Sequence, residues 1–229
     1  DYADFLELDI HELDAPLRKL AVMVEKMADK YEQGDPEQAR SQMNRAQAAL
    51  QQMRSGIDAL YQLSRLETEE LSSNECDLNI MITQLVSELK IQNKDSEVYE
   101  KHEGLPMLTG DQKQLRQLFR ELLQNAIRFN ENKVNVQVEI TSSALTADEK
   151  TELKLPESEN YFKLVIRDNG IGFAKEDSAK IFKPFVRLNG RSAYPGNGIG
   201  LAICQKIVDS HHGIIYAEPN PPGGTSILL

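Results

Sequence analysis

The sequence lacks the features that mark several classes of protein. Its 229 residues include no Trp, and its two cysteines, Cys76 and Cys204, lie far apart with no CxxC pair. Two isolated thiols favour reduced, buried or near-surface residues over a disulfide or a metal site. There is also no signal peptide and no apolar run close to the roughly 20 residues that cross a bilayer.

Basic residues are fewer than acidic residues. Lys and Arg number 26 against 36 Asp and Glu, which gives a formal net charge of −10. Because no net basic surface offsets phosphate repulsion, this balance argues against nucleic-acid binding. Hydrophobic residues make up 40% of the chain, enough for a core, and the length suits one large or two ordinary domains. The chain opens on Asp1 and stops on Leu229 within a strand-like run, so we expect a piece of a longer protein.

The first third of the chain has helical periodicity. Apolar residues recur mostly at three- and four-residue steps from about residue 2 to 31 and again from 36 to about 70. Gly34 breaks the first helix, and Asp35 can cap the second, with Gln38 in the capping-box position. Two long helices with a short connection predict an antiparallel hairpin.

A lone hairpin cannot enclose a core, so its apolar stripe needs a partner. Packing against the C-terminal half of the same chain is one solution. A second copy of the chain is the more economical one. We therefore expect residues 3–70 to form a homodimer with a four-helix bundle.

The pattern changes after a short polar stretch at residues 71–75. We expect a helical domain at 1–71 and a second domain, of mixed α and β structure, at 76–229. Predicted helices cover residues 78–89, 112–129 and 201–208, and predicted strands cover residues 97–100, 134–140, 161–166, 214–216 and 225–228. Residues 142–159 predict a solvated hairpin extension without chemistry of its own. This mixture predicts an α/β sandwich, a mixed sheet with helices on one face.

Two predicted helices in this domain carry capping signals. Asp111 can cap the helix that follows it, with Gln114 in the capping-box position. Gly213 suits the C′ position after the last helix, whose final turn holds His211 and His212. We expect these histidines to be solvated residues favoured by the helix dipole rather than metal ligands.

An apolar strand-like run ends in the carboxylate of Asp168, which Gly170 and Gly172 follow. Glycine has no Cβ, so it tolerates φ > 0 and lets backbone amides approach a ligand. A glycine-rich run at 196–200 leads into a helix, where amides can bind an anion. Either stretch alone is ordinary turn chemistry. The spacing is neither a Walker A motif nor GxGxxG after a strand, so a dinucleotide fold is not supported.

Glu121 and Asn125 stand four apart and therefore face the same way on one helix. A carboxylate and an amide there can hold Mg²⁺ through oxygens and water, as hard cations require. Arg128, one turn on from Asn125, can reach a phosphate. Together with Asp168 and the glycines, these residues indicate nucleotide binding.

The combination resembles the Bergerat-type ATP-binding domain of sensor histidine kinases, within the wider family of gyrase, heat-shock-protein-90 and mismatch-repair ATPases. The matching stretches keep the family's order over roughly residues 77–229. They are the N box at 121–126, G1 at 168–172, the F box at 182–185, G2 at 196–201 and Gly224-Thr225.

The resemblance implies the roles of these residues. Asp168 would read the adenine amino group, and Asn125, with Glu121 beside it, would bind Mg²⁺. Residues 189–197 would form a lid that orders over the ATP phosphates. The remaining nucleotide-binding residues would be Arg128, Phe129, Gly170, Gly172, Phe185, Gly196, Gly198, Gly200, Leu201 and Thr225.

Residues 11–17 resemble the H box of the dimerisation and phosphoacceptor domain of these kinases. By this resemblance His11 accepts the γ-phosphoryl group of ATP. An imidazole that titrates near neutrality can present a neutral, nucleophilic nitrogen. Glu12 beside it could orient or deprotonate the ring at the other nitrogen.

Two positions depart from the family's pattern. Ala15 stands four residues after His11, where the family often has an amide or Thr that helps position water to dephosphorylate the partner. The Ala side chain cannot hydrogen-bond, so we expect weak or absent phosphatase activity. Glu121 stands where these kinases usually have Asn, and in the related ATPases a Glu there activates water. It could aid Mg²⁺ binding, assist phosphotransfer or permit slow hydrolysis.

The resemblance implies a cytoplasmic ATP-dependent protein-histidine kinase core of a two-component system. It would bind Mg-ATP, autophosphorylate on His11 and pass the phosphoryl group to an aspartate of a response-regulator receiver domain. This fragment would not itself span a membrane, although its parent could be anchored in the inner or plasma membrane. Two alternatives stay open: a dimeric ATP-binding scaffold whose kinase activity has decayed, and a plain ATPase that uses Glu121 as its base.

Overall fold

The computed structural model describes residues 2–68, 71–94, 96–102, 104–133, 135–156, 160–188, 194, 196–221 and 223–229. Within these ranges, side chains are described except at residues 2–16, 52, 59, 67 and 68. The chain divides into two compact units, Asp1–Gln62 and Leu63–Leu229. Over the described residues, no helix combines the length and the apolar character that crossing a membrane requires.

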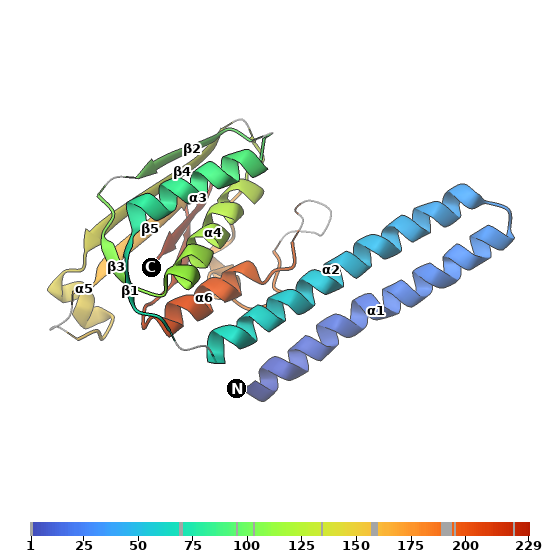
Figure 1. Cartoon of the computed structure of the whole chain (residues 1–229), viewed down its shortest axis with the longest axis horizontal. Helices are drawn as coiled ribbons and strands as arrows, with labels where there is room; N and C mark the ends of the chain where they lie inside the picture. Colours follow the sequence, from blue (N-terminus) through green and yellow to red (C-terminus); the bar gives the residue numbers. More distant parts are fainter. Residues whose placement is uncertain are drawn as a thin grey trace. The chain divides into compact units, whose positions relative to one another are not determined.

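The first unit consists of two long helices, α1 (Tyr2–Glu32) and α2 (Pro36–Thr68) (Figure 1). Only the end of α2, from Leu63 on, belongs to the second unit. Both predicted helices are confirmed. The Asp35 cap is confirmed as well, because the Gln38 backbone N–H donates to Asp35 Oδ1 at 3.1 Å. Gly34 adopts φ +75°, which turns the chain between the helices.

The second unit is built on a five-stranded mixed sheet. Its strands are β2 (Val98–His102), β4 (Val136–Ala144), β5 (Phe162–Asp168), β6 (Tyr216–Pro219) and β7 (Thr225–Leu228), in the order β2-β4-β5-β7-β6. β2 pairs in parallel with β4, and the other neighbours pair antiparallel. A small second sheet, which the sequence did not predict, pairs β1 (Asn74–Asp77) with β3 (Met107–Gly110).

Three helices lie on one face of this sheet: α3 (Leu78–Gln92), α4 (Gln112–Arg128) and α6 (Gly200–Ser210) (Figure 1). The strand β4 alternates between buried and more exposed residues, and Val136, Val138 and Ile140 are at most 2% exposed. Such alternation places one face of a strand in the core. The predicted sandwich, a mixed sheet with helices on one face, is confirmed.

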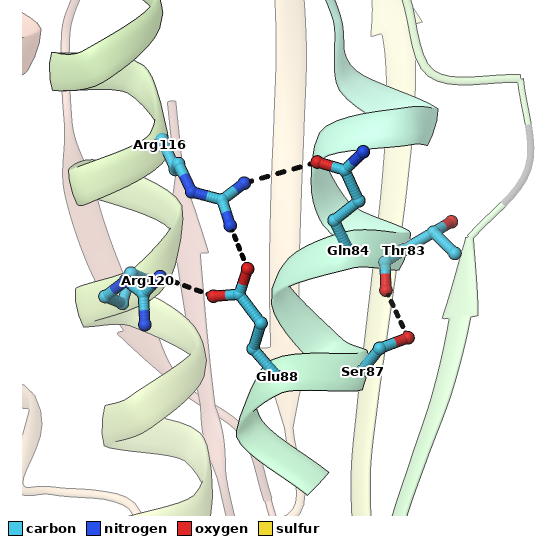
Figure 2. Close-up of polar contacts among 6 residues, drawn as sticks. All are labelled: Thr83, Gln84, Ser87, Glu88, Arg116 and Arg120. Atoms are coloured by element: carbon cyan, nitrogen blue, oxygen red, sulfur yellow. Dashed lines mark hydrogen bonds and ion pairs between the residues drawn. The ribbon is translucent and has the colours of Figure 1, made fainter. Parts of the chain in front are cut away.

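Helices α3 and α4 run side by side and in parallel, joined by one carboxylate (Figure 2). Glu88 of α3 accepts hydrogen bonds from Arg116 and, at 2.6 Å, from Arg120, both on α4. Gln84, one turn before Glu88, lies 3.5 Å from Arg116. The guanidinium bonds hold the pKa of Glu88 below its usual range. This cross-link joins α3 to the helix that carries the N box.

The polar extension between β4 and β5 contains a short helix, α5 (Ala147–Glu152), which was not predicted. Thr146 and Glu149 form a reciprocal capping box at its start. Glu149 also accepts a hydrogen bond from Lys163 of β5, which ties the extension to the sheet. A 3₁₀ turn, η1 (Lys175–Asp177), follows β5 further along the chain.

Two predicted helix ends differ from the structure. Asp111 caps α4 as predicted, but the Gln114 half of the box is wrong, because the Asp111 backbone N–H donates instead to His211. Gly213 is not the C′ residue of α6. His212 takes the left-handed conformation (φ +57°), and the Gly213 N–H bonds the Val208 carbonyl at 2.9 Å, so Gly213 is one position further on. Histidine is among the residues that tolerate this conformation.

Candidate functional site

One cavity of the second unit brings together most of the predicted nucleotide-binding residues. Its walls come from the second half of α4, the end of β5 and the turn after it, the residues that lead into α6, and β7. The predicted residues that line it are Asn125, Arg128, Phe129, Asp168, Gly172, Gly196, Gly198, Gly200, Leu201 and Thr225. Gly170, Phe185 and Glu121 do not line it. Gly170 and Phe185 are the sequence neighbours of two lining residues, Ile171 and Val186.

The apolar part of this wall was not predicted from the sequence. Strand β5 contributes Ile166, and the F-box region contributes Ile181 and Val186. The other apolar lining residues are Leu122, Ile171, Phe173, Leu188, Tyr194 and Ile227. The apolar run at 181–186 was visible in the sequence, but a short apolar stretch does not reveal whether it faces the core or a cavity. Together the apolar residues suit a flat, poorly hydrated ligand group.

Asp168 is the last residue of β5, and backbone amides hold its side chain. Its Oδ1 accepts hydrogen bonds from the N–H of Gly170 at 2.8 Å and of Thr225 at 3.1 Å. No described residue donates to Oδ2, so this oxygen remains available to a ligand. Burial raises the pKa of Asp168, and the two amides partly offset that rise.

The turn after Asp168 has the conformation that its glycines predict. Gly172 adopts φ +66°, and a Cβ at Gly170 would lie 2.7 Å from the Phe129 carbonyl oxygen. The first glycine is thus required by close approach and the second by backbone conformation.

A pair of asparagines, which sequence reasoning missed, also fixes this turn. Asn130, only 2% exposed, donates to Asn169 Oδ1 at 2.6 Å. The same oxygen accepts the Gln137 N–H, and Asn169 Nδ2 donates to the Asn135 carbonyl. The network ties the end of α4 to the turn beside Asp168. Because its partners come from separate segments of the chain, no local spacing signals it.

Glu121 lies on α4 beside the start of α6. A Cβ at Gly200 would lie 2.6 Å from Glu121 Oε2, so a residue with a side chain would clash with the carboxylate. Burial raises the pKa of Glu121, although Arg128 and Arg120 act in the opposite direction. Within the described residues, no hydrogen bond to the carboxylate is present. Glu121 is half-buried, and an unpaired carboxylate that is partly removed from water is costly, so its position indicates a ligand nearby.

A side chain bonds the backbone carbonyls at the end of α4 that carries Asn125 and Arg128. Lys133 donates to the carbonyls of Ile127 and Arg128, at 2.5 and 3.1 Å. Burial lowers the pKa of Lys133. A cation at the carboxyl end of a helix also interacts favourably with the helix dipole.

Arg128 itself lies close to the start of the glycine-rich run. A Cβ at Gly196 would be 3.2 Å from Arg128 Nη1, and the same nitrogen is 3.5 Å from Asn125 Oδ1. The ring of Phe129 lies 5.2 Å from that of Tyr194. A cation and two aromatic rings therefore border the cavity near the amides that precede α6.

Two predicted elements lie wholly or partly outside the described residues. His11, Glu12 and Ala15 fall within α1, where side chains are described only from Leu17 on. The predicted lid at 189–197 is described only at Tyr194 and from Gly196 onward.

The second unit thus combines an apolar cavity, a fixed carboxylate at a strand end and the amide side chain of Asn125 on a helix. Amides at the amino end of α6, a site suited to anions, lie at the same cavity. This combination defines a nucleotide-binding α/β sandwich.

Comparison with known proteins identifies the family. Residues 110–229 match the family described as "Histidine kinase-, DNA gyrase B-, and HSP90-like ATPase", and the chain belongs to this family. The whole chain is 27% identical to the phytochrome-like protein Cph1 of Synechocystis sp.. It is 28% identical over 99% of its length to the signal transduction histidine-protein kinase BaeS of Escherichia coli.

A solved structure shares the fold. Histidine kinase ThkA, crystallised in complex with the response regulator protein TrrA, superposes with a TM-score of 0.64 and 21% identity. The match covers 98% of this chain and 60% of that one. The chain spans only part of the curated relatives, 29% of Cph1 and 46% of BaeS.

Proposed function

We propose that the second unit binds Mg-ATP in this cavity and that the chain transfers the γ-phosphoryl group to His11. The observation that carries the nucleotide part is the carboxylate of Asp168. Two amides hold its Oδ1 in place, and Oδ2 is left for a ligand that donates a hydrogen bond. The adenine amino group is such a donor, and the apolar wall suits the base.

Asn125 and Glu121 would hold the magnesium ion. An amide oxygen and an unpaired carboxylate are the hard donors that Mg²⁺ prefers. In the described part of the chain, no group of three or more His, Cys, Asp or Glu could cage a metal. This fits an ion whose remaining ligands are phosphate oxygens and water. When bound, the ion would neutralise charge on the phosphates.

The chain's own residues would position the transfer. A neutral ring nitrogen of His11 would attack the γ-phosphorus, forming a P–N bond while the bond to the bridging oxygen breaks and ADP leaves with the electron pair. Glu12 would orient the imidazole and take the proton from its other nitrogen. Arg128 and the amides before α6 would offset the charge of the phosphates.

The phosphoryl group would then pass to an aspartate of a response-regulator receiver, and a homodimer through residues 3–70 would carry the phosphoacceptor. Two findings support the relay. The curated relatives include sensor kinases, and the solved ThkA structure contains a response regulator. Transfer to a receiver occurs through phosphohistidine, whose chemistry gives the experiment its readout.

The test is incubation of the chain with ATP labelled at the γ-phosphate. We expect acid-labile, base-stable label that disappears in His11→Gln and persists in the control His102→Gln. If ATP binds but no label forms, the chain is a nucleotide-binding scaffold and the kinase proposal fails.

A plain ATPase is the second candidate, favoured by the half-buried, unpaired Glu121. It predicts that His11→Gln releases phosphate as fast as the unaltered chain and that Glu121→Gln does not. The kinase proposal predicts instead that His11→Gln releases phosphate more slowly than the unaltered chain. Measuring free phosphate in the same reactions therefore separates the two functions.

A further inference from the structure

A polar cluster lies at the ends of α4 and α6 that face away from the cavity. The cavity is lined by the second half of α4 and the first residues of α6, whereas Asp111 precedes α4 and His211 follows α6. Asp111 is 9% exposed. Leu122, the first α4 residue in the wall, is eleven positions further on, about 16 Å along the helix.

Both carboxylate oxygens of Asp111 are used, and for different partners. Oδ1 caps α4, accepting from the N–H groups of Lys113 at 2.9 Å and Gln114 at 3.0 Å. Oδ2 accepts from the backbone N–H of Ser72 at 3.2 Å and from its hydroxyl at 2.6 Å. An ordinary cap needs only the first set. The second set holds the segment between α2 and β1.

The backbone of Asp111 is held by α6. Its N–H donates to His211 Nε2 at 3.0 Å, and His211 Nδ1 lies 2.8 Å from the Ile207 carbonyl. These partners assign the proton to Nδ1 and the acceptor role to Nε2. Because His211 occupies the N–H that Gln114 would otherwise bond, the reciprocal capping box does not form. Gln114 Oε1 is buried without a partner in the described structure.

The cluster holds the linker, which is the segment between α2 and β1, at a second point. Pairing of β1 with β3 holds the chain from Asn74, which lies opposite Gly110, the residue before Asp111. The bonds to Ser72 carry that attachment two residues closer to the helical hairpin. The linker, the start of α4 and the end of α6 therefore meet at one residue, Asp111, the first two at its carboxylate and the third at its backbone N–H.

We propose that Asp111 is a positioning residue that anchors the linker to the helices of the nucleotide site, so that the rate of phosphoryl transfer to His11 depends on the bond between Asp111 and Ser72. This inference rests on the proposed kinase function. Neither Asp111, Ser72 nor His211 lines the cavity, so the affinity for ATP should be independent of the bond. Holding two reacting groups in a restricted geometry raises the rate of a transfer step, and freeing one of them lowers it.

Asp111→Asn separates the anchor from the cap. Asn remains a good N-cap, but its NH₂ group cannot accept from Ser72. In single-turnover assays on the 229-residue chain, we expect the rate of His11 labelling at saturating ATP to fall about tenfold, equivalent to about 1.4 kcal/mol. The Kd for ATP should change less than about twofold.

Variants of the linker supply the controls. Ser72→Ala should lower the rate as Asp111→Asn does, and Ser72→Thr, which keeps the hydroxyl, should restore it. The neighbouring exposed Ser73→Ala should have no effect. An unchanged or faster rate in Asp111→Asn and Ser72→Ala overturns the anchor, as does a parallel loss of ATP affinity, which would indicate a general loosening of the domain.

Amide hydrogen exchange separates failure of the anchor from failure of the kinase. The Ser72 amide should exchange faster in Asp111→Asn than in the unaltered chain, whether or not His11 is labelled. Absence of label in every variant, the unaltered chain included, rejects the kinase proposal and the rate effect that rests on it. Label in the unaltered chain with unchanged Ser72 exchange in Asp111→Asn rejects the anchor alone.

Discussion

The two units of the chain differ in how completely they bury their own apolar side chains. In the second unit, Ile82, Phe119 and Ile207 are at most 1% exposed. In the helical unit, Leu17, Leu50 and Ile57 are each more than half exposed, at 52%, 54% and 51%. The nucleotide unit therefore has a closed core, whereas the helical unit leaves apolar area in contact with water.

Six of the exposed apolar residues of the helical unit form two regular rows. On α2 they are Met43, Leu50 and Ile57, and on α1 they are Leu17, Val24 and Tyr31, seven residues apart in both cases. Val22 and Tyr61 are exposed outside these rows. Seven-residue spacing is typical of helices that pack against one another along their length. A second copy of the chain would supply matching rows, and this difference between the units leads to three predictions.

The largest effect should follow from a charge in the exposed row. Ile57→Glu appears twice in a two-fold dimer. Each copy loses roughly 1.5–3 kcal/mol of apolar burial, so we expect the dimer Kd to rise about a thousandfold. Sedimentation should show monomers at concentrations where the unaltered chain is dimeric, with ATP affinity unchanged. Gln51→Glu, an exposed polar position on the same helix, is the matched control, and a dimer of Ile57→Glu would mean that the rows are not the interface.

Asp168→Asn should have the opposite effect, weakening ATP binding and leaving dimerisation unchanged. The substitution keeps the shape but can turn a donor toward the adenine amino group, and a hydrogen bond to a charged group contributes about 1.5–3 kcal/mol. We expect ATP affinity to fall about a hundredfold by titration calorimetry while the dimer stays intact. The control Asp148→Asn makes the same change at an exposed position of α5. Retention of ATP affinity by Asp168→Asn would remove the base-reading role.

The features that the sequence could predict are those with a local signal. The helices α1, α2 and α4 were predicted because apolar periodicity over many residues is a local signal. Asp168 was placed at a strand end for the same reason, since an apolar run preceded it and two glycines followed. Asn125, Asp168 and Gly200 then meet in one cavity because each stands at or near the end of a predictable element.

The features that were not predicted depend on contacts between residues far apart in the sequence. The strands β1 and β3 have four residues each and pair across some thirty positions, so neither carries a pattern of its own. His211 was expected to be solvated, which is wrong, because it bonds the backbone of Asp111 one hundred residues away. The α5 helix, by contrast, had a visible signal in Thr146 and Glu149, which form a capping box.

The smallest effect concerns the stability of the nucleotide unit and tests the cost of the half-buried Glu121 carboxylate. Burial raises the folded-state pKa of Glu121 above the unfolded value of about 4.3. Between those two pKa values the folded state binds more protons than the unfolded state, so stability falls as pH rises through this window. Glu121→Gln keeps the shape and does not titrate.

In the absence of nucleotide, Glu121→Gln should therefore unfold at a higher temperature than the unaltered chain above the raised pKa of Glu121. The difference should disappear below about pH 4, where the carboxyl is protonated in both states. Thermal unfolding across this pH range measures it, with the exposed Glu152→Gln as control. A Tm gain independent of pH would indicate better packing rather than a removed charge. The predicted pH dependence would instead mean that the nucleotide unit, although its core is closed, keeps a destabilising carboxylate beside the start of α6, where bound Mg-ATP would pair it.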